Sequence, residues 1–325
     1  KPEKFTQEQL YRLRLCFCRD CYLLQIADVV PPEILFKNYF YFSSAITILR
    51  DHFANYAAEV TARFLTPENA TVVEIGCNDG VLLKPFAEKN IQTLVGVDPA
   101  TNIVKTIDDT RINIVNDFFC ERAAGKILQE YGPVNLICAN NVCAHSVDFK
   151  DITRGIYSLL DEDGVFVFEV HYLGKLIEEI QYDMIYHEHI YYYSILALSK
   201  HFDRHDMEVF DIKPIPIHAG SMRYYVRKKG RLQTEDVSGR VVSLLAEEKE
   251  KGYDREEIFL DYAARVSASK DKLMALLDRV VAQGKSVAGY GASGRANTII
   301  QYCGIDHRHL DYIIDDASAK WGYYT

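Results

Sequence analysis

The hydrophobic positions of residues 37–230 fall into short apolar runs separated by stretches with helical spacing. Apolar runs typical of buried strands occur at Thr71–Ile75, Thr93–Val97, Asn113–Val115, Val134–Ala139 and Gly164–Val170. The spacing also predicts a helix near Ile46–Phe64. Apolar strands separated by helices are typical of a parallel α/β sheet. Two further runs, Val209–Ile215 and Met222–Arg227, have only a loop between them, which predicts an antiparallel hairpin at the sheet edge.

The residues on either side of this region follow other patterns. Near the N-terminus, a predicted strand, Tyr22–Ile26, precedes a break at Pro31-Pro32. The stretch from Thr234 to Gln283 has the charge and apolar spacing of long packed helices. Strand Ser286–Gly289 and a glycine turn open another α/β unit, whose last strand, Tyr312–Asp316, completes no sheet. We therefore predict domains at 1–36, 37–230 and 231–325, with both ends of the chain cut.

Composition narrows the class of protein. Of the 325 residues, 48% are hydrophobic and 26% charged, as in ordinary globular proteins. No apolar run reaches the roughly 20 residues that cross a bilayer, and the N-terminus has no signal-peptide pattern. The net charge of −9, without a long basic stripe, argues against nucleic-acid binding. Several of the eight cysteines lie inside apolar strands, which favours a reducing compartment, and we expect the cytoplasm.

A glycine turn follows the first apolar strand of the central region. The turn reads Glu74-x-Gly76-x-x-x-Gly80, and small residues there let the backbone approach a ligand at positive φ. Asp98 ends the next strand, where a carboxylate suits the two hydroxyls of a ribose. A nicotinamide dinucleotide fits the same spacing, but the turn lacks the third glycine of a dinucleotide fingerprint. A glycine turn without any ligand is the remaining alternative.

These motifs resemble the class I methyltransferases that use S-adenosylmethionine (SAM). The resemblance implies that Asp98 holds the ribose of SAM and that Asp117 lies near the adenine, flanked by Phe118. It also implies that the methionine side of SAM is lined by residues of the turn and of strand Val134–Ala139: Glu74, Gly76, Asn78, Gly80, Asn140 and Asn141.

The sequence Tyr186-His187-Glu188-His189 is the densest group of proton-transfer side chains in the chain. Methyl transfer to carbon needs a base that removes a proton beside a carbonyl, and a group that holds the enolate. An imidazole suits the first task, and a phenol or second imidazole suits the second. Two other interpretations stay open: a metal site formed by the two histidines, and aromatic packing at a strand edge.

Seven motifs spread over nearly the whole chain resemble a narrower family, the SAM-dependent C-methyltransferases of nucleotide-linked (dTDP) 4-keto-deoxysugars. They are Phe17–Cys21, Pro32–Phe36 with Tyr39–Ser44, Val73–Gly80, Asn140–His145, Tyr186–His189, His218–Arg223 and Gly289–Arg295. The resemblance implies an N-terminal zinc knuckle, a Rossmann-like methyltransferase domain and a C-terminal Rossmann-like α/β domain.

The same resemblance assigns roles to individual residues. It implies that His189 is the base and that Glu188 orients it or shares its proton. Contacts with the sugar near its ketone would come from Tyr186, His145 and Tyr41, with Tyr39 as a rival to Tyr41. Ser221 and Arg223 would contact the substrate, although Ala219-Gly220 departs from the Gly-Gly that the family usually shows.

Two further motifs complete the resemblance. Cys18 and Cys21 form half of a zinc site, since structural zinc takes four ligands. The alternative is a pair of reduced thiols in a hairpin. Gly289-x-Gly291-x-x-Gly294 follows a strand and opens a helix, as phosphate-binding loops do. The resemblance brings Gly291, Ser293 and Arg295 to the diphosphate of the nucleotide sugar; a packing turn is the alternative.

We therefore expect a SAM-dependent C-methyltransferase whose partner is a nucleotide-diphosphate sugar, and which is a monomer or small homo-oligomer that binds neither nucleic acid nor membrane. The alternatives are an O- or N-methyltransferase, a reductase that binds a nicotinamide at Gly289–Gly294, and a non-catalytic nucleotide-sugar binder.

Overall fold

The computed structural model describes residues 9–231, 236–316 and 320–322. In this part of the chain, seven strands form one sheet in the order β5 (Ile112–Val115), β4 (Thr93–Val97), β3 (Thr71–Ile75), β6 (Val134–Asn140), β7 (Leu160–His171), β10 (Ser221–Lys228) and β9 (Met207–Ile215). The strands from β5 to β7 are parallel neighbours, and β10 is antiparallel to both β7 and β9. The predicted parallel α/β sheet and its terminal hairpin are therefore confirmed.

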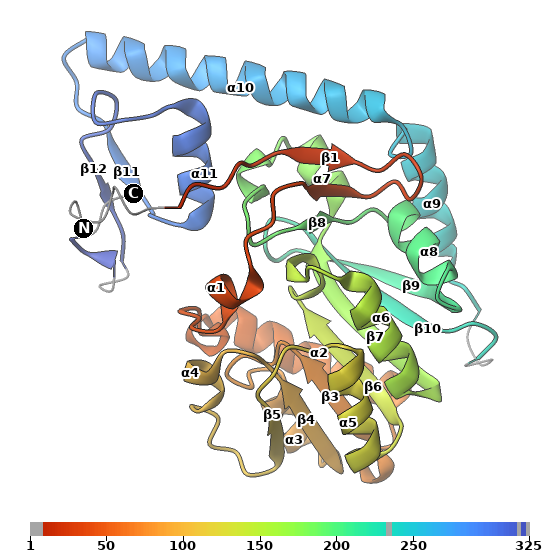
Figure 1. Cartoon of the computed structure of the whole chain (residues 1–325). Helices are drawn as coiled ribbons and strands as arrows, with labels where there is room; N and C mark the ends of the chain where they lie inside the picture. The colour runs from red at the N-terminus through yellow and green to blue at the C-terminus, as the bar shows by residue number, and fades with distance from the viewer. Residues whose placement is uncertain (1–8, 232–235, 317–319, 323–325) are drawn as a thin grey trace.

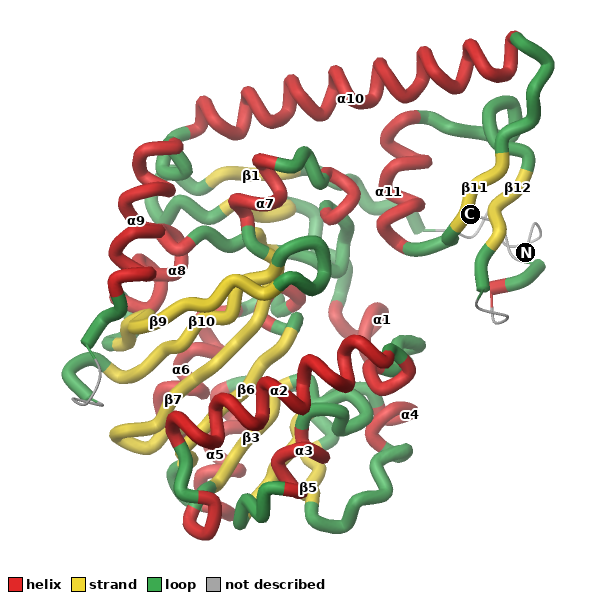
Figure 2. Tube along the Cα trace, turned by 180° about the vertical axis from the view of Figure 1, so that it is seen from behind, coloured by secondary structure: helices red, strands yellow, loops and turns green. Residues whose placement is uncertain are grey.

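Helices cover both faces of this sheet (Figures 1 and 2). Helices α2 (Thr47–Phe64) and α3 (Leu83–Glu88) contribute buried side chains to one apolar cluster, as does α4 (Thr101–Val104). The cluster on the other face includes side chains of α5 (Glu121–Tyr131), α6 (Phe149–Leu159), α8 (Ile195–Asp203) and α9 (Gly239–Lys251). Strands buried on both faces need near-continuous apolar residues, which explains why the strand pattern of the sequence was strong.

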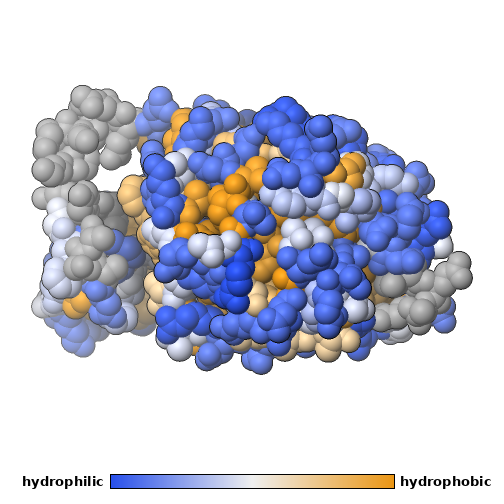
Figure 3. All heavy atoms as spheres, turned by 90° about the horizontal axis from the view of Figure 1, so that it is seen from below, coloured by the Kyte–Doolittle hydropathy of each residue, from blue (hydrophilic) through white to orange (hydrophobic). Residues whose placement is uncertain are grey.

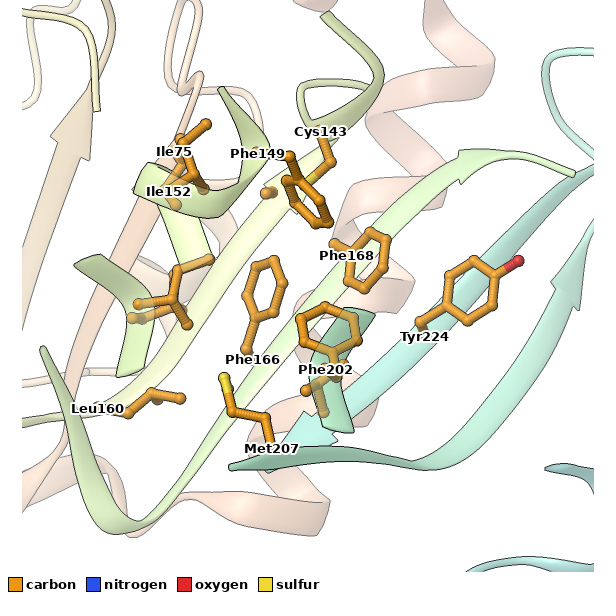
Figure 4. Close-up of a cluster of buried hydrophobic side chains, with 14 of the residues drawn as sticks. Ile75, Cys143, Phe149, Ile152, Leu160, Phe166, Phe168, Phe202, Met207 and Tyr224 are labelled. Atoms are coloured by element: carbon orange, nitrogen blue, oxygen red, sulfur yellow. The ribbon is translucent and has the colours of Figure 1, made fainter. Parts of the chain in front are cut away.

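Aromatic side chains fill much of the core between the sheet and α8 (Figure 4). The rings of Phe166 and Phe168 stack with centroids 5.0 Å apart, and Phe168 stacks on Tyr224 at the same distance. Phe202 of α8 packs against both phenylalanines. This packing joins β7 to β10. It therefore fixes the position of β7, whose carboxyl end at His171 leads into the segment before the Tyr186–His189 motif.

A second, antiparallel sheet contains β1 (Leu15–Phe17), β2 (Leu24–Ile26) and β8 (Tyr191–Tyr192). It packs in one apolar cluster with α7 (Leu173–Glu178) and α10 (Glu256–Ala282). The predicted strand Tyr22–Ile26 is thus shorter than expected, because Tyr22 adopts a positive φ of 65° in the turn. Through β8, the N-terminal hairpin is joined directly to the segment that follows His189.

The C-terminal part begins after the long helix α10. Strands β11 (Ala288–Tyr290) and β12 (Tyr312–Ile314) are parallel and are connected by α11 (Gly294–Cys303), which is the predicted start of an α/β unit. The predicted helical stretch begins at α9, while its expected first residue, Thr234, lies outside the described residues. The short helices are α1 (Pro32–Phe36), η2 (Ser43–Ala45), η3 (Pro67–Asn69), η4 (Cys143–His145) and η5 (Tyr182–Met184).

Hydrophilic residues surround the middle of the face shown in Figure 3. Seen from below, one face shows apolar side chains gathered in its middle (Figure 3). Within the described ranges, none of the helices has both the length and the apolar character needed to cross a bilayer.

Candidate active site

One cavity of about 1190 Å³ runs between the carboxyl ends of the central strands and the C-terminal unit. In open α/β sheets this edge is where ligands bind. The cavity brings together predicted residues from seven stretches of the chain: Tyr39, Tyr41, Gly76, Asn78, Asp98, Phe118, Asn140, Asn141, His145, Tyr186, Glu188, His189, Ser293 and Arg295. Six of the seven motifs thus contribute residues to a single cavity, and Phe17–Cys21 does not.

Gly76 opens the turn after β3 and has a positive φ of 70°. A Cβ atom at this position would lie 2.2 Å from Cγ2 of Val142, so no larger residue fits without movement. Its backbone N–H donates to the carbonyl oxygen of Val97 at 2.7 Å, which ties the turn to β4. Gly80, with a φ of 75°, shapes the same turn but does not line the cavity.

Three polar side chains meet beside this turn. Asp98 follows β4, lines the cavity, and accepts hydrogen bonds from the backbone N–H groups of Asn78 (2.9 Å) and Ala100 (2.8 Å). Burial raises the pKa of Asp98, and burial together with Asp98 raises the pKa of Glu74. Oε2 of Glu74 and both amide atoms of Asn140 are buried without a hydrogen-bond partner among the described residues. Such polar atoms, beside a turn that excludes a Cβ, fit a polar small-molecule ligand.

The segment that carries Tyr39 and Tyr41 covers this turn. The side-chain amide of Asn78 donates to the carbonyl oxygen of Tyr41 at 2.9 Å and accepts from the N–H of Ser43 at 3.0 Å. Asn102 exchanges two hydrogen bonds with the backbone of Tyr39. Asn78 therefore holds the covering segment with its side chain, a role that the sequence did not predict.

A smaller hollow of about 330 Å³ adjoins this end of the cavity. Asp117 and Phe118 line it together with Asn116 and Thr101. Arg122 donates to Asp117 at 2.8 Å and lowers the pKa of this carboxyl. Phe118 lines both volumes, so it marks their junction, whereas Asp117 belongs to the smaller hollow only.

His189 lies at the other end of the cavity and is buried, with 9% of its surface exposed. Its Nδ1 lies 3.3 Å from the carbonyl oxygen of Met184, which can only accept, so Nδ1 carries the proton. Nε2 is then the basic nitrogen, and it accepts a hydrogen bond from the Tyr186 hydroxyl at 2.9 Å. Burial, with a smaller contribution from His145, lowers the pKa of His189 well below its ordinary value. The imidazole is therefore neutral and can take a proton.

His145 lies in η4, after β6, and its ring centroid is 5.0 Å from that of His189. Burial lowers the pKa of His145 to about 4. Glu188 accepts a hydrogen bond from the hydroxyl of Tyr39 at 3.2 Å, and burial raises the pKa of this carboxyl. The structure thus places Tyr39 rather than Tyr41 against Glu188, although both tyrosines line the cavity.

The glycine loop of the C-terminal unit reaches the same cavity. Ser293 is the N-cap of α11 and accepts from the N–H of Ala296 at 3.2 Å. Arg295 lines the cavity beside Ser293 and donates to Asp183. Gly291, with a φ of 92°, donates its N–H to the carbonyl oxygen of Ile314 and lies outside the lining. It therefore closes the turn between β11 and α11.

Ser221 and Arg223 do not line the cavity, contrary to the contact that the resemblance implied. The side chain of Arg223 is 2% exposed and donates through Nε to Glu169 at 2.7 Å and through Nη1 to Glu59 at 3.1 Å. His52 holds the second oxygen of Glu169 at 2.8 Å. Side chains of β10 point alternately to the two faces of the sheet, and Arg223 points to the face that α2 covers. There it pairs with Glu59 of α2 and with Glu169 of β7.

Cys18 and Cys21 lie in one tight turn, where the N–H of Cys21 contacts the sulfur of Cys18 at 3.5 Å. In the described ranges, no group of three or more histidine, cysteine, aspartate or glutamate side chains is placed to hold a metal. Two thiols supply half of a tetrahedral zinc site, so these residues by themselves do not fit the zinc that the resemblance implied.

Among the cavity residues to which the sequence analysis gave no role are His171, Met184, His218 and Lys320. Asp183, which pairs with Arg295, was given no role either. His218 and Ala219 have positive φ values of 50° and 63°. Positive φ is uncommon for residues other than glycine, so neither residue type predicts it. The motif His218–Arg223 could have identified His218. The sequence analysis instead assigned the serine and the arginine of this motif to the substrate.

Two protein families match this chain. One, described as "Methyltransferase domain", matches residues 49–212, and the other, described as "C-methyltransferase C-terminal domain", matches residues 216–325. The chain is also 30% identical over 315 residues to the C-methyltransferase NovU of Streptomyces niveus, an alignment that covers 97% of this chain and 74% of that protein.

Solved structures show weaker likenesses. Magnesium protoporphyrin IX methyltransferase of Synechocystis PCC 6803, with bound SAH, has a TM-score of 0.42 and 12% identity, and the match covers 55% of this chain and 83% of that one. A Haloferax volcanii methyltransferase complexed with its Trm112 activator has a TM-score of 0.43 and 15% identity, with coverages of 55% and 92%.

Proposed function

This chain belongs to the C-methyltransferase family, and from this premise we propose that it transfers a methyl group from SAM to a carbon atom of a nucleotide-linked 4-keto-deoxysugar. One observation carries the proposal. A neutral, buried imidazole, His189, shares a single cavity with the glycine turn at Gly76 and the carboxylate of Asp98.

The residues around Gly76 fit the methyl donor. Asp98 would bind the ribose hydroxyls, and Glu74 and Asn140, whose buried polar atoms lack partners, would bind the amino acid part. Phe118 would flank the adenine, with Asp117 in the adjoining hollow. When bound, SAM supplies a positively polarised methyl group, which a nucleophilic carbon can accept.

At the other end, His189 would remove the proton beside the ketone. Its Nδ1–H bond to Met184 fixes the tautomer, so Nε2 faces the cavity as the base. The carbon acid would replace the Tyr186 hydroxyl at Nε2, and that hydroxyl would then donate to the ketone oxygen as enolate charge develops. Glu188, bonded to Tyr39, would receive or share the proton, since burial raises the pKa of this carboxyl.

The nucleotide end of the substrate would lie at the glycine loop. Arg295 carries a planar guanidinium suited to phosphate oxygens, and Ser293 lies at the N-terminus of α11. Lys320 also lines this end of the cavity, where it donates to Asp315 at 2.9 Å. Both cations would turn toward a diphosphate when it binds.

A direct assay tests the proposal. The protein is incubated with SAM and a panel of nucleotide-linked 4-keto sugars in deuterated water, and the products are weighed by mass spectrometry. We expect one sugar to gain a methylene mass, and deuterium to exchange into the position beside the ketone. Methylation without such exchange would favour an O- or N-methyltransferase. Binding of a nicotinamide cofactor without binding of SAM would favour a reductase, and binding of the sugar without turnover would favour a binding protein.

The cytoplasm remains our proposed compartment. All eight cysteines are free thiols, and three of those in the central fold, Cys77, Cys138 and Cys143, are buried. Thiols that persist in this state are typical of a reducing environment.

A further inference from the structure

Three consecutive residues before the Tyr186–His189 segment are each held by a different contact. Asp183 accepts from Arg295 of α11, through Nε at 2.8 Å and Nη2 at 2.5 Å. The carbonyl oxygen of Met184 contacts Nδ1 of His189 at 3.3 Å. The carbonyl oxygen of Ile185 accepts from the Thr298 hydroxyl at 3.3 Å. One short turn, η5, thus touches both the base and the C-terminal unit.

The packing around η5 makes this link stiff. Met184 and Ile185 are buried. Tyr182 packs its ring against Tyr302 at 5.5 Å and lies 3.6 Å from the sulfur of Cys303, both in α11. A displacement of Asp183 therefore changes the position of the carbonyl that holds the proton-bearing nitrogen of His189, because these atoms belong to adjacent residues in a packed turn.

Once a diphosphate enters the cavity, Arg295 can pair either with Asp183 or with the phosphate oxygens. Its side chain is 42% exposed, and it lines the cavity beside Ser293 and Lys320. Asp183 is 19% exposed and offers a single oxygen to both nitrogens. A diphosphate carries more negative charge and more acceptor oxygens than one carboxylate, so it is the stronger partner for this fork.

We propose that Asp183 is a positioning residue that competes with the diphosphate of the substrate for Arg295, and so transmits occupancy of the nucleotide end to His189. This inference rests on the proposed function. In the free protein Asp183 holds Arg295. When the diphosphate binds, Arg295 turns to phosphate, Asp183 is released, and the η5 turn resets the Met184 contact with the base.

Thymidine diphosphate, with uridine diphosphate as a second probe, tests the competition. Binding is measured by titration calorimetry for the wild type, Asp183→Asn, Arg295→Gln and the double variant. We expect Asp183→Asn to bind the nucleotide about threefold to tenfold more tightly, since a partly exposed competing and repelling charge is removed. The gain should vanish in the Arg295→Gln background. An ion pair with a purely structural role predicts unchanged or weaker binding, and that result would overturn the inference.

A second readout begins with the wild type alone. The imidazole ¹⁵N signals of His189 are recorded by NMR in the wild type with and without thymidine diphosphate, and in Asp183→Asn where it folds. We expect the nucleotide to shift these signals in the wild type and to shift them less in the variant. Nucleotide binding that leaves the wild-type signals unmoved would overturn the coupling.

The outcomes separate this inference from the proposed function. If the wild type binds neither nucleotide, the nucleotide-sugar substrate class is contradicted and the inference with it. If it binds them and Asp183→Asn shows no gain, only the role of Asp183 is contradicted. SAM binding, measured in parallel for every variant, reports whether the fold is intact.

Discussion

The two ends of the cavity are built in different ways. The end around Gly76 comes from the carboxyl ends of three adjacent parallel strands, β3, β4 and β6, within residues 71–140. The end around His189 is assembled from segments between Tyr39 and Lys320 that lie far apart in the sequence. The first end is therefore fixed by the sheet, while the second depends on how loops and the C-terminal unit pack.

The two ends nevertheless share one electrostatic property. Burial raises the pKa of Glu74 and Asp98 at the first end, and lowers the pKa of His145 and His189 at the second. In both cases the neutral form of the side chain is favoured, because a low-dielectric surrounding penalises charge of either sign. A neutral base is compatible with such a cavity, whereas the positive charge of a sulfonium donor would need an anionic or polar partner there.

The largest effect is expected from His189→Asn, which should disable one end and spare the other. Loss of the base should lower turnover by about 10²- to 10⁴-fold, while SAM affinity stays unchanged. Methylation assays and SAM calorimetry measure the two quantities separately. The neighbouring His187→Asn is the matched control, because His187 lies outside the cavity lining. Wild-type turnover in His189→Asn would remove the base assignment.

Arg223→Met tests whether this residue belongs to the acceptor end at all. Since its partner Glu169 would be left buried with only His52 beside it, we expect the free energy of unfolding to fall by about 3 kcal/mol. The KM for the sugar should not change. Adding Glu169→Gln should recover part of the stability, as measured by urea denaturation. A raised KM with unchanged stability would return Arg223 to the substrate site.

Gly76→Ala should damage the donor end. A non-glycine residue at its positive φ is strained, and its Cβ would collide with Val142. We expect SAM affinity to fall by about tenfold or more, since such strain costs on the order of 1–3 kcal/mol. Gly125→Ala in α5 is the control, because a Cβ there meets nothing within 4 Å. Unchanged SAM affinity in Gly76→Ala would place the donor elsewhere.

The smallest effect within any single pH unit concerns the pH dependence of stability, which should have opposite signs at the two ends. His145, whose pKa falls to about 4 on folding, stabilises the fold fully above its unfolded pKa near 6.5 and loses this contribution as pH falls toward 4. Relative to His145→Gln, the wild type should therefore lose up to about 1.4 kcal/mol per pH unit over that window. Denaturation at several pH values measures this difference.

Glu74 provides the opposite comparison. Its pKa is raised on folding, so relative to Glu74→Gln the wild type should gain stability as pH falls below the folded pKa of this carboxyl. If both residues stabilised the fold more, or both less, as pH falls, the conclusion that both ends favour neutral side chains would be contradicted.

The fold of the end around Gly76 was the part that the sequence predicted well. Strands Thr71–Ile75 and Thr93–Val97 have the predicted bounds, because fully buried parallel strands require unbroken β-branched and apolar runs. The positive φ of Gly76 and the carboxylate after β4 followed from the same local pattern. Strand burial and turn geometry depend on residues that are adjacent in the sequence, so the sequence alone can predict them.

The contacts at the end around His189 were predicted only in part. Motifs identified His145 and Tyr186–His189, but no local pattern could reveal that Tyr39 contacts Glu188 or that Asp183 pairs with Arg295, since these partners are far apart in sequence. Arg223 was assigned to substrate because a sequence does not show which face of a strand meets a buried carboxylate. The two-residue strand β8 is too short for any periodicity to predict.

Helix α10 connects α9 to the β11–α11–β12 unit, so its length sets both the distance and the rotation between them (Figure 1). Its 27 residues correspond to a rod of roughly 40 Å, and each added residue would turn whatever follows by about 100°. A single insertion in its middle would thus swing the β11–α11–β12 unit around the rod axis and part Arg295 from Asp183. The length of this helix therefore sets the orientation of that unit, and only an insertion of a whole number of turns would preserve it.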